Sequence, residues 1–377
     1  MTVPPLGAGV DAVDTPALVI DLDAMERNLA TMAAFARQHH VRLRPHAKMH
    51  KSAAIARLQI AAGAVGVCVQ KTSEAEALAA AGIGDIYISN EVIDSGKLAR
   101  VAALAGRVRL AIAVDSVEGV ERLATAVAAA GSAIEVFVEV DVGQGRCGVP
   151  PAAAGALAHR VVSHSPPEGG LVFAGLQAYH GAGQHIRGAA ERAAASQHAA
   201  SLARAAQASI GAAGIACPLV TGAGTGSFAF DVAADLWGEL QAGSYLFMDR
   251  DYADNAAAPG APRFEPALFV KSQVMSRGSA HAVIDAGHKS HAVDSGPPAV
   301  WQRELDAASC SDEHTVLRPR PGAGGAALPQ LGETVWLVPG HCDPTVNLHD
   351  RYVAVRGGLI AGYVEAVWAI EARGCVS

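Results

Sequence analysis

The sequence predicts an α/β protein, a (β/α)8 barrel of the TIM type followed by a smaller β domain. From Val41 onward, eight short apolar segments alternate with helical segments over roughly 220 residues, which is the size of such a barrel. The apolar segments carry few polar residues, as strands do when helices cover both faces of a parallel sheet. Beyond Asp254 the helical periodicity fades, and short β-branched runs separated by turn residues replace it.

The eight barrel strands are each expected to end in polar residues before the chain turns into the next helix. The expected strands are 41–43, 65–69, 86–89, 109–114, 134–140, 171–177, 218–220 and 239–242. Expected helices include 23–40, a run from 52, a run from 73, and runs ending near 105, 130, 163 and 213. The sequence Ser73-Glu74-Ala75-Glu76 has the spacing of a capping box at a helix start. An open, doubly wound sheet is the alternative to a barrel.

A Pro-, Ala- and Gly-rich linker, 255–262, separates the barrel from the β domain. The β runs expected after it are 268–275, 281–284, 333–338, 352–356 and 360–368. The N-terminal strand 17–22 lies outside the count of eight and is expected to join them. The predicted domains are therefore a barrel over 23–254 and a β domain made of 1–22 and 255–377.

Composition argues against several classes of protein. Hydrophobic residues make up 51% and charged residues 17%, as in a compact globular protein. The net charge of -7 gives no electrostatic support for binding nucleic acid. There is no apolar run of membrane-spanning length, and the first residues lack the order of a signal peptide, so we expect a cytoplasmic protein. The six cysteines form no C-x-x-C pair, so neither a disulfide framework nor a structural zinc site is expected.

The basic stretch Arg44-Pro45-His46-Ala47-Lys48-Met49-His50-Lys51 follows the first barrel strand. It places Lys48 at the carboxyl end of that strand, where α/β barrels carry their chemistry. We expect the neighbouring basic side chains to lower the pKa of the Lys48 amine and make it a better nucleophile toward a carbonyl. The alternative is a basic surface turn that binds a phosphate or nothing.

Polar residues come directly after many of the other apolar strands. They are Gln70, Asn90, Asp115, Arg146, Tyr179, His180 and Thr221. A barrel gathers the carboxyl ends of its strands around one mouth, so these side chains are expected to meet there. Any single one is compatible with a solvated loop, but the whole ring indicates a site.

The sequence Thr221-Gly222-Ala223-Gly224-Thr225-Gly226-Ser227 leaves the seventh strand. Its N–H groups and hydroxyls are suited to cradling a phosphate, and Gly243-Ser244 offers a second set after the eighth strand. Phosphate sites after strands seven and eight recur in barrels. The loop lacks the lysine of a Walker loop and the spacing of a Rossmann fingerprint, so a plain turn is the alternative.

The sequence His341-Cys342-Asp343 follows a strand of the β domain. In an extended chain, residues i and i+2 point to the same side, so His341 and Asp343 are expected to converge while Cys342 faces away. One imidazole and one carboxylate make an open site suited to Mn²⁺ or Mg²⁺, whereas a thiolate in place of Asp343 would favour Zn²⁺. A polar loop that bonds to itself is the alternative.

Together these stretches resemble the fold-type III pyridoxal-phosphate enzymes, in particular the D-threonine aldolase and D-serine dehydratase group. The matching stretches are TPALVIDL, RPHAKMHK, QKTSEAEALAAAG, ISNEV, VEVDVGQGRCGV, LQAYHG with QH following, TGAGTGS, LQAGSYLFMDRDY and HCDPTVNLHD. They span about residues 15 to 370. The resemblance implies an alanine-racemase-like barrel with a C-terminal β domain, in a homodimer whose subunits face each other near the active site.

The resemblance also implies a role for each matching residue. Lys48 would be the Schiff-base lysine for pyridoxal 5'-phosphate, and His185 a candidate base. The phosphate would be held by the loop 221–227 (Thr221, Gly224, Thr225 and Gly226) together with Gly243, Ser244 and Tyr252, and the ring flanked by Gln70, Arg146 and Tyr179. His341 and Asp343 would be the ligands of a divalent metal, Mn²⁺ or Mg²⁺.

The metal motif points to one reaction within this group. Its dehydratases tend to carry His-x-Cys, whereas this chain carries His-x-Asp, the aldolase-like version. The resemblance therefore implies retro-aldol cleavage of a D-3-hydroxy amino acid of the D-threonine type to glycine and an aldehyde. The alternatives are a 3-hydroxy-D-aspartate aldolase, a D-serine or 3-hydroxyaspartate dehydratase, a non-catalytic protein that binds pyridoxal phosphate, and a barrel that binds another phosphorylated ligand.

Overall fold

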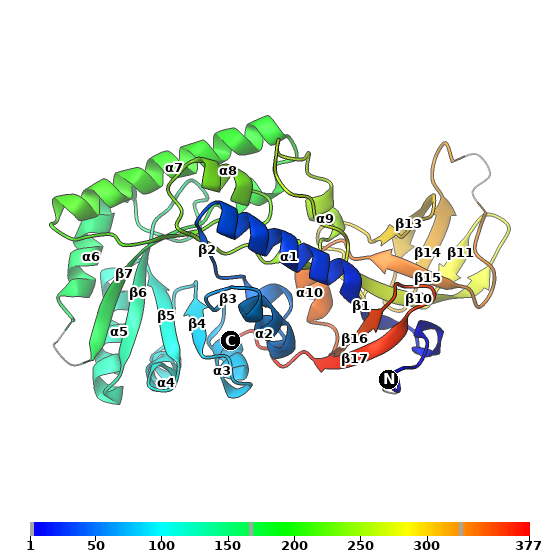
Figure 1. Cartoon of the computed structure of the whole chain (residues 1–377), viewed down its shortest axis with the longest axis horizontal. Coiled ribbons are helices and arrows are strands. Elements are labelled where there is room, and N and C mark those ends of the chain that lie inside the picture. Colours follow the sequence, from blue (N-terminus) through cyan, green and yellow to red (C-terminus); the bar gives the residue numbers. More distant parts are fainter. Residues whose placement is uncertain (1–3, 166–168, 324–326) are drawn as a thin grey trace.

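A computed structural model describes residues 4–165, 169–323 and 327–377. Two β-sheets organise the chain (Figure 1). One has eight strands and lies among the helices, and the other has nine strands and lies at the opposite end of the molecule. The helix α1 (Leu22–Gln38) crosses the middle of the molecule between them.

The eight-stranded sheet is the predicted barrel. Its strands are β2 (Arg42–Leu43), β3 (Val67–Val69), β4 (Asp85–Ile88), β5 (Arg109–Val114), β6 (Ala133–Glu139), β7 (Gly170–Ala178), β8 (Val220–Gly222) and β9 (Glu239–Leu240). All their pairings are parallel, in the order β2-β9-β8-β7-β6-β5-β4-β3. The segment after β2 closes the circle, because His46 bridges Cys68 of β3. The expectation of a barrel is confirmed.

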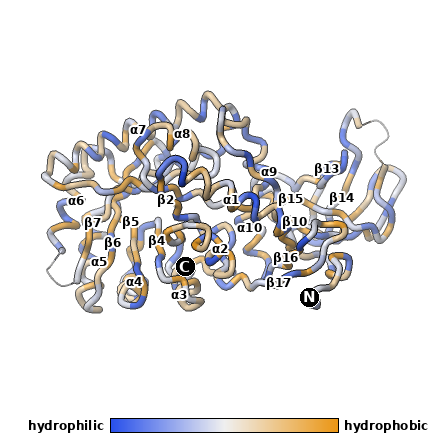
Figure 2. The backbone as a smooth tube through the Cα atoms, in the orientation of Figure 1, coloured by the Kyte–Doolittle hydropathy of each residue, from blue (hydrophilic) through white to orange (hydrophobic). Residues whose placement is uncertain are grey.

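The helices around the barrel begin and end close to the expected positions. They are α2 (Ala53–Ala61), α3 (Thr72–Ala80), α4 (Ser95–Ala105), α5 (Val117–Ala130), α6 (Ala154–Val162), α7 (Ala189–Ala212) and α8 (Phe228–Ala233). In α5 the buried residues Val120, Leu123 and Val127 follow a helical spacing, so one apolar face covers the sheet. Apolar residues also gather along the barrel strands (Figure 2). None of the helices in the described ranges has both the length and the apolar character that a bilayer crossing requires.

The capping box of α3 differs from the one expected. The helix begins at Thr72, one residue before Ser73, and its capping carboxylate is Glu74. Glu74 Oε2 accepts hydrogen bonds from the backbone N–H groups of Gln70 (2.9 Å) and Lys71 (3.1 Å). The N-cap residue is Lys71, two residues before the expected Ser73, so the carboxylate three positions after it is Glu74 and not Glu76.

The nine-stranded sheet contains the N-terminal strand, as expected. Its strands are β1 (Ala17–Asp21), β10 (Leu268–Arg277), β11 (Ala282–Ile284), β12 (Ala299–Val300), β13 (Leu305–Cys310), β14 (Thr315–Pro319), β15 (Thr334–Val338), β16 (Arg351–Arg356) and β17 (Tyr363–Ala369). β1 lies between β10 and β16. The strands β12 to β14 were not expected, because they are short or poor in β-branched residues. The domain boundaries at 22 and 254 stay a prediction.

The β domain contacts the barrel at the segment that carries Lys48. The Tyr352 hydroxyl of β16 donates a hydrogen bond to the His50 carbonyl (2.6 Å), and the Ser52 hydroxyl donates to the Ala369 carbonyl (2.7 Å). Both bonds lie within four residues of Lys48. The nine-stranded sheet therefore fixes the basic segment from outside, while the barrel strand fixes it from within.

Candidate active site

A cavity of about 320 Å³ lies at the carboxyl ends of the barrel strands, facing the β domain. All but two of the predicted site residues line it: Lys48, Gln70, Arg146, Tyr179, His185, Gly224, Thr225, Gly243, Ser244, Tyr252, His341 and Asp343. Thr221 and Gly226 do not, nor do Asn90, Asp115 and His180 from the ring of strand ends. The fold therefore gathers residues from both ends of the chain around one hollow.

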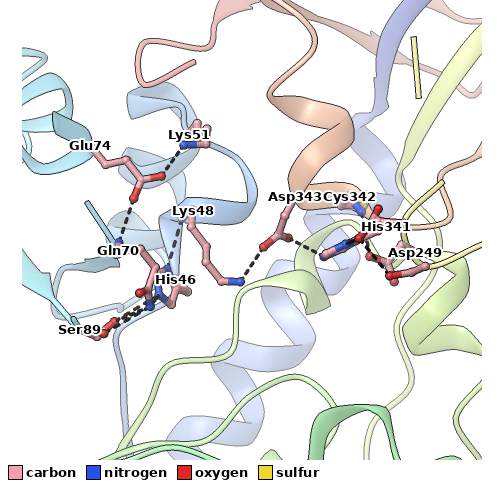
Figure 3. Close-up of polar contacts among 12 residues, drawn as sticks. His46, Lys48, Lys51, Gln70, Glu74, Ser89, Asp249, His341, Cys342 and Asp343 are labelled. Carbon is pink, nitrogen blue, oxygen red and sulfur yellow. Dashed lines mark hydrogen bonds and ion pairs between the residues drawn. The ribbon is translucent and has the colours of Figure 1, made fainter. Parts of the chain in front are cut away.

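Lys48 lies on a single 3-10 turn (η2, Ala47–Met49) directly after β2. Its ammonium Nζ is 2.7 Å from Asp343 Oδ2, and Figure 3 shows the lysine side chain extended toward that carboxylate. Asp343 belongs to α10 (Cys342–Val346) of the β domain. The residue expected to hold pyridoxal phosphate and a residue expected to hold a metal are thus in direct contact across the two sheets.

The expectation that neighbouring cations lower the pKa of Lys48 is wrong. The Asp343 carboxylate raises the pKa of Lys48 above its ordinary value, and this outweighs the effect of burial. The other basic residues act weakly, because the fold supplies each charged one with a carboxylate. Arg44 contacts Glu239 at 3.2 Å, and Lys51 forms an ion pair with Glu74.

His46 is a lining residue that the sequence reasoning did not single out. Burial lowers its pKa well below the ordinary value, so the imidazole is neutral. Its Nδ1 accepts the backbone N–H of Lys48 (3.4 Å), and its Nε2 lies 3.0 Å from the amide nitrogen of Gln70 (Figure 3). The predicted site residue Gln70 is therefore linked to the Lys48 turn through His46. Its place two residues before Lys48 was the only sequence signal for it.

The two predicted phosphate loops meet at the cavity with free donors. Within the described residues, the backbone N–H groups of Thr225 and Gly243 have no hydrogen-bond partner. The hydroxyls of Ser244 and Tyr252 belong to the same wall. A Cβ on Gly243 would come 2.7 Å from the His46 carbonyl, so only glycine fits this close approach. This donor set and its tight shape suit a phosphate group.

Two predicted phosphate contacts face elsewhere. The Thr221 hydroxyl is fully buried and donates to Glu239 (2.9 Å), while it accepts from Gln241 (2.9 Å). The Gly226 N–H donates to Gln184 Oε1 (2.9 Å). The prediction that these two residues contact the phosphate is therefore not supported. They hold the loop in place, because the chain turns their polar groups away from the cavity.

Asp231 is a buried carboxyl that stabilises the same loop. It accepts hydrogen bonds from the Ser227 and Ser196 hydroxyls, and burial raises its pKa to about 6 despite these bonds.

The raised pKa of Asp231 predicts a pH-dependent stability of the folded protein. The protonated carboxyl favours the folded state most strongly below pH 3.8, the ordinary pKa, and this contribution is lost as pH rises through about 6. Wild type should therefore lose about 2 kcal/mol of unfolding free energy relative to Asp231→Asn between pH 4 and 7. Urea unfolding at several pH values measures this, and parallel profiles would contradict it.

Arg146 and Tyr179 form one side of the cavity. The Arg146 guanidinium lies over the Tyr179 ring, 5.9 Å from its centroid. His185 lines the same cavity, with Nδ1 2.6 Å from Asp251 Oδ2, and its ring is tilted by 36° against the Tyr252 ring with centroids 5.5 Å apart. These aromatic and cationic groups line the cavity and are suited to contact a ring-shaped, anionic cofactor.

His341 and Asp343 converge, but not in an extended chain. His341 has extended backbone at the start of α10, and Asp343 lies in the first turn of that helix. Their Nε2 and Oδ1 atoms are 3.8 Å apart. Asp343 Oδ1 is buried and has no hydrogen-bond partner among the described residues, so this oxygen and the imidazole fit a divalent cation. Cys342 is fully buried outside the cavity, with its N–H bonded to Asp249 (2.9 Å, Figure 3).

Comparison with known proteins shows the family to which the chain belongs. The family model described as alanine racemase, N-terminal domain, matches residues 20–251, and one described as a serine dehydratase domain matches residues 267–355. The D-threonine aldolase of Arthrobacter sp is 47% identical over 96% of this chain and 93% of that protein. The chain belongs to the D-threonine aldolase group of fold-type III pyridoxal-phosphate enzymes.

Two further relatives of this aldolase-group chain are similar over nearly their whole length. The 3-hydroxy-D-aspartate aldolase of Paracoccus denitrificans (strain Pd 1222) is 41% identical over 98% of this chain and 94% of that protein. The crystal structure of D-threonine aldolase from Filomicrobium marinum superposes with a TM-score of 0.93, at 48% identity and with all of both chains covered. The fold of this group member is therefore shared over the entire chain.

Two carboxylates that contact site histidines were not among the predicted site residues. Asp251 contacts His185, and Asp294 Oδ2 lies 2.7 Å from His341 Nδ1. Asp251 lies in a stretch that resembles the aldolase group, yet nothing in that stretch pairs it with a histidine. Asp294 lies in a segment that carried no signal, 47 residues before its partner.

Proposed function

We propose that the chain is an aldolase that uses pyridoxal phosphate and a divalent metal to cleave D-3-hydroxy amino acids of the D-threonine type to glycine and an aldehyde. The observation that carries this proposal is the 2.7 Å contact between Lys48 Nζ and Asp343 Oδ2. In this proposal Lys48 is the amine that binds the cofactor and Asp343 is a metal ligand, so the contact supports a site that uses both groups together. A substrate bound there would have its amino group and its β-hydroxyl held at the same time.

The residues around the cavity fit the cofactor. The N–H groups of Thr225 and Gly243 and the hydroxyls of Ser244 and Tyr252 would hold the phosphate, with Gly224 in the same cavity wall. Gln70, Arg146 and Tyr179 would lie around the ring. When bound, the cofactor supplies an electron sink for the carbanion left at Cα. The contribution of the protein is to orient the bond that breaks.

His341 and Asp343 would hold Mn²⁺ or Mg²⁺, which would polarise the substrate β-hydroxyl. His185 would accept the hydroxyl proton. As the carbonyl double bond forms at Cβ, the Cα–Cβ bond breaks and its electron pair remains at Cα. Protonation of Cα then gives glycine, and the other product is the aldehyde.

Asp294 supports this metal site in the proposed function. Its carboxylate binds Nδ1 of His341, which leaves Nε2 as the ligand atom. The variant Asp294→Asn should bind Mn²⁺ about 10- to 100-fold more weakly. Calorimetric titration of the cofactor-loaded enzyme measures this, with Asp350→Asn as the control at an exposed carboxylate. Equal Mn²⁺ affinity in both variants would contradict the role of Asp294.

A product assay tests the function itself. The purified enzyme, with pyridoxal phosphate and Mn²⁺, is given D-threonine, 3-hydroxy-D-aspartate and D-serine in turn. Glycine from D-threonine is the expected result. Keto acid and ammonia would indicate a dehydratase instead. Preference for 3-hydroxy-D-aspartate would favour the second candidate, a 3-hydroxy-D-aspartate aldolase, which the 41% identity to the Paracoccus enzyme supports.

We also propose that the enzyme works as a cytoplasmic homodimer. The family resemblance supports this assembly, with the two subunits facing each other near the active site. Light scattering of the purified enzyme should give twice the chain mass of 38.4 kDa. A monomer with full activity would contradict the proposal.

A further inference from the structure

His185 is held by one of its two ring nitrogens. It ends the 3-10 turn η4 (Ala182–His185) and lines the same cavity as Lys48 and Asp343. Its Nδ1 lies 2.6 Å from Asp251 Oδ2, while Nε2 has no hydrogen-bond partner in the part of the chain that the structure describes. The ring also packs against Tyr252, with the two ring centroids 5.5 Å apart and the planes tilted by 36°. Nε2 is thus the nitrogen left for a ligand.

Asp251 is itself rigidly placed. Its side chain is only 6% exposed, and its second oxygen accepts a hydrogen bond from the Arg187 guanidinium. The backbone N–H of Asp251 donates to the Gly340 carbonyl (3.2 Å), next to the metal ligand His341. Burial alone would raise the pKa of Asp251, but the hydrogen bond and positive charge of Arg187 help to hold this pKa below its ordinary value. The carboxylate is therefore charged and fixed.

We propose that Asp251 is a positioning residue that holds a proton of His185 on Nδ1 and leaves Nε2 free to accept a proton from a substrate in the cavity. A neutral imidazole carries one N–H, and a carboxylate acceptor at Nδ1 selects the tautomer whose Nε2 can take a proton. When Nε2 accepts the substrate hydroxyl proton, the resulting imidazolium lies beside the Asp251 carboxylate. This inference rests on the proposed function, in which His185 is the base.

Arg187 and Asn255 extend this arrangement to the interdomain linker. Arg187 donates to the Asn255 side-chain oxygen (2.8 Å), and the Asn255 amide donates to the Gln184 carbonyl (2.9 Å). The alternative is that Asp251 has only a structural role and stabilises the contact between the η4 turn and the linker. The two roles differ in the effect that Asp251→Asn has on kcat when His185 is absent.

The test compares Asp251→Asn with Asp254→Asn, a half-exposed aspartate three residues later, paired with Arg250 at 3.7 Å. With D-threonine, Asp251→Asn should lower kcat about 100-fold, at the low end of what a general base contributes, while KM changes less than about threefold. Asp254→Asn should match wild type. In a His185→Ala background, Asp251→Asn should cause no further loss of kcat, because Asp251 acts through the imidazole. Affinity for pyridoxal phosphate should stay unchanged.

A second readout does not require turnover. ¹⁵N-histidine NMR of the cofactor-loaded enzyme, with the His185 signals assigned by their loss in His185→Ala, reports which ring nitrogen carries the proton. We expect Nδ1–H in wild type and a shift toward Nε2–H in Asp251→Asn. If D-threonine is not cleaved, the proposed function fails while this tautomer result still stands. Nε2–H in wild type, unchanged kcat in Asp251→Asn, or a full multiplicative loss in the double variant would each overturn the role of Asp251.

Discussion

Replacing Lys48 with alanine should lower the rate of D-threonine cleavage by at least about a thousandfold, because no other amine is placed to bind the cofactor covalently. Among the described residues that line the cavity, Lys48 is the one lysine. The same variant should lose the covalent link to pyridoxal phosphate. Borohydride treatment followed by peptide mapping should mark residue 48 in wild type and no residue in Lys48→Ala.

A matched control separates this effect from a general loss of charge. Lys289 also forms an ion pair, with Glu313, but its side chain is 66% exposed and does not line the cavity. Lys289→Ala should keep wild-type activity and wild-type labelling of Lys48. Persistent labelling in Lys48→Ala, or cleavage at a rate near that of wild type, would show that another amine carries the cofactor.

The sequence predicted the position of Lys48 but not its electrostatics. Position follows from a local pattern, an apolar strand that ends in a basic turn, and local patterns are visible in one dimension. The charge balance depends on residues that are distant in sequence. Asp343 lies 295 residues from Lys48, and Glu239 lies 195 residues from Arg44. The cations were therefore visible as a cluster, while the carboxylates that neutralise them were not.

Side-chain direction was the second limit of prediction from sequence. Thr221 and Gly226 belong to the loop that reaches the cavity, yet their polar groups bond to Glu239 and Gln184. A loop with several irregular residues has no fixed alternation, so spacing alone cannot tell which groups face a ligand. The pairing of Asp251 with His185 was hidden for the same reason. Residue types and their neighbourhood could be predicted, but not their individual contacts.

Replacing Asp343 with alanine should abolish metal-dependent cleavage, with a loss of at least about a thousandfold in kcat at saturating cofactor. Asp343 carries the buried oxygen that has no partner among the described residues, and its other oxygen holds Lys48. The variant should still bind pyridoxal phosphate at Lys48, because the phosphate donors come from the barrel. Visible absorbance of the bound cofactor should therefore persist, while calorimetry detects no Mn²⁺ binding.

Asp343→Ala also tests whether the two parts of the site act together. Without the carboxylate, the pKa of Lys48 should fall, because Asp343 is the largest cause of its increase. The pH dependence of the cofactor absorbance should therefore shift toward lower pH in the variant, even though cleavage is lost. Wild type treated with a chelator should lose cleavage without this shift, because its carboxylate is still present. Full cleavage by Asp343→Ala in the presence of chelator would show that the reaction needs no metal at this position.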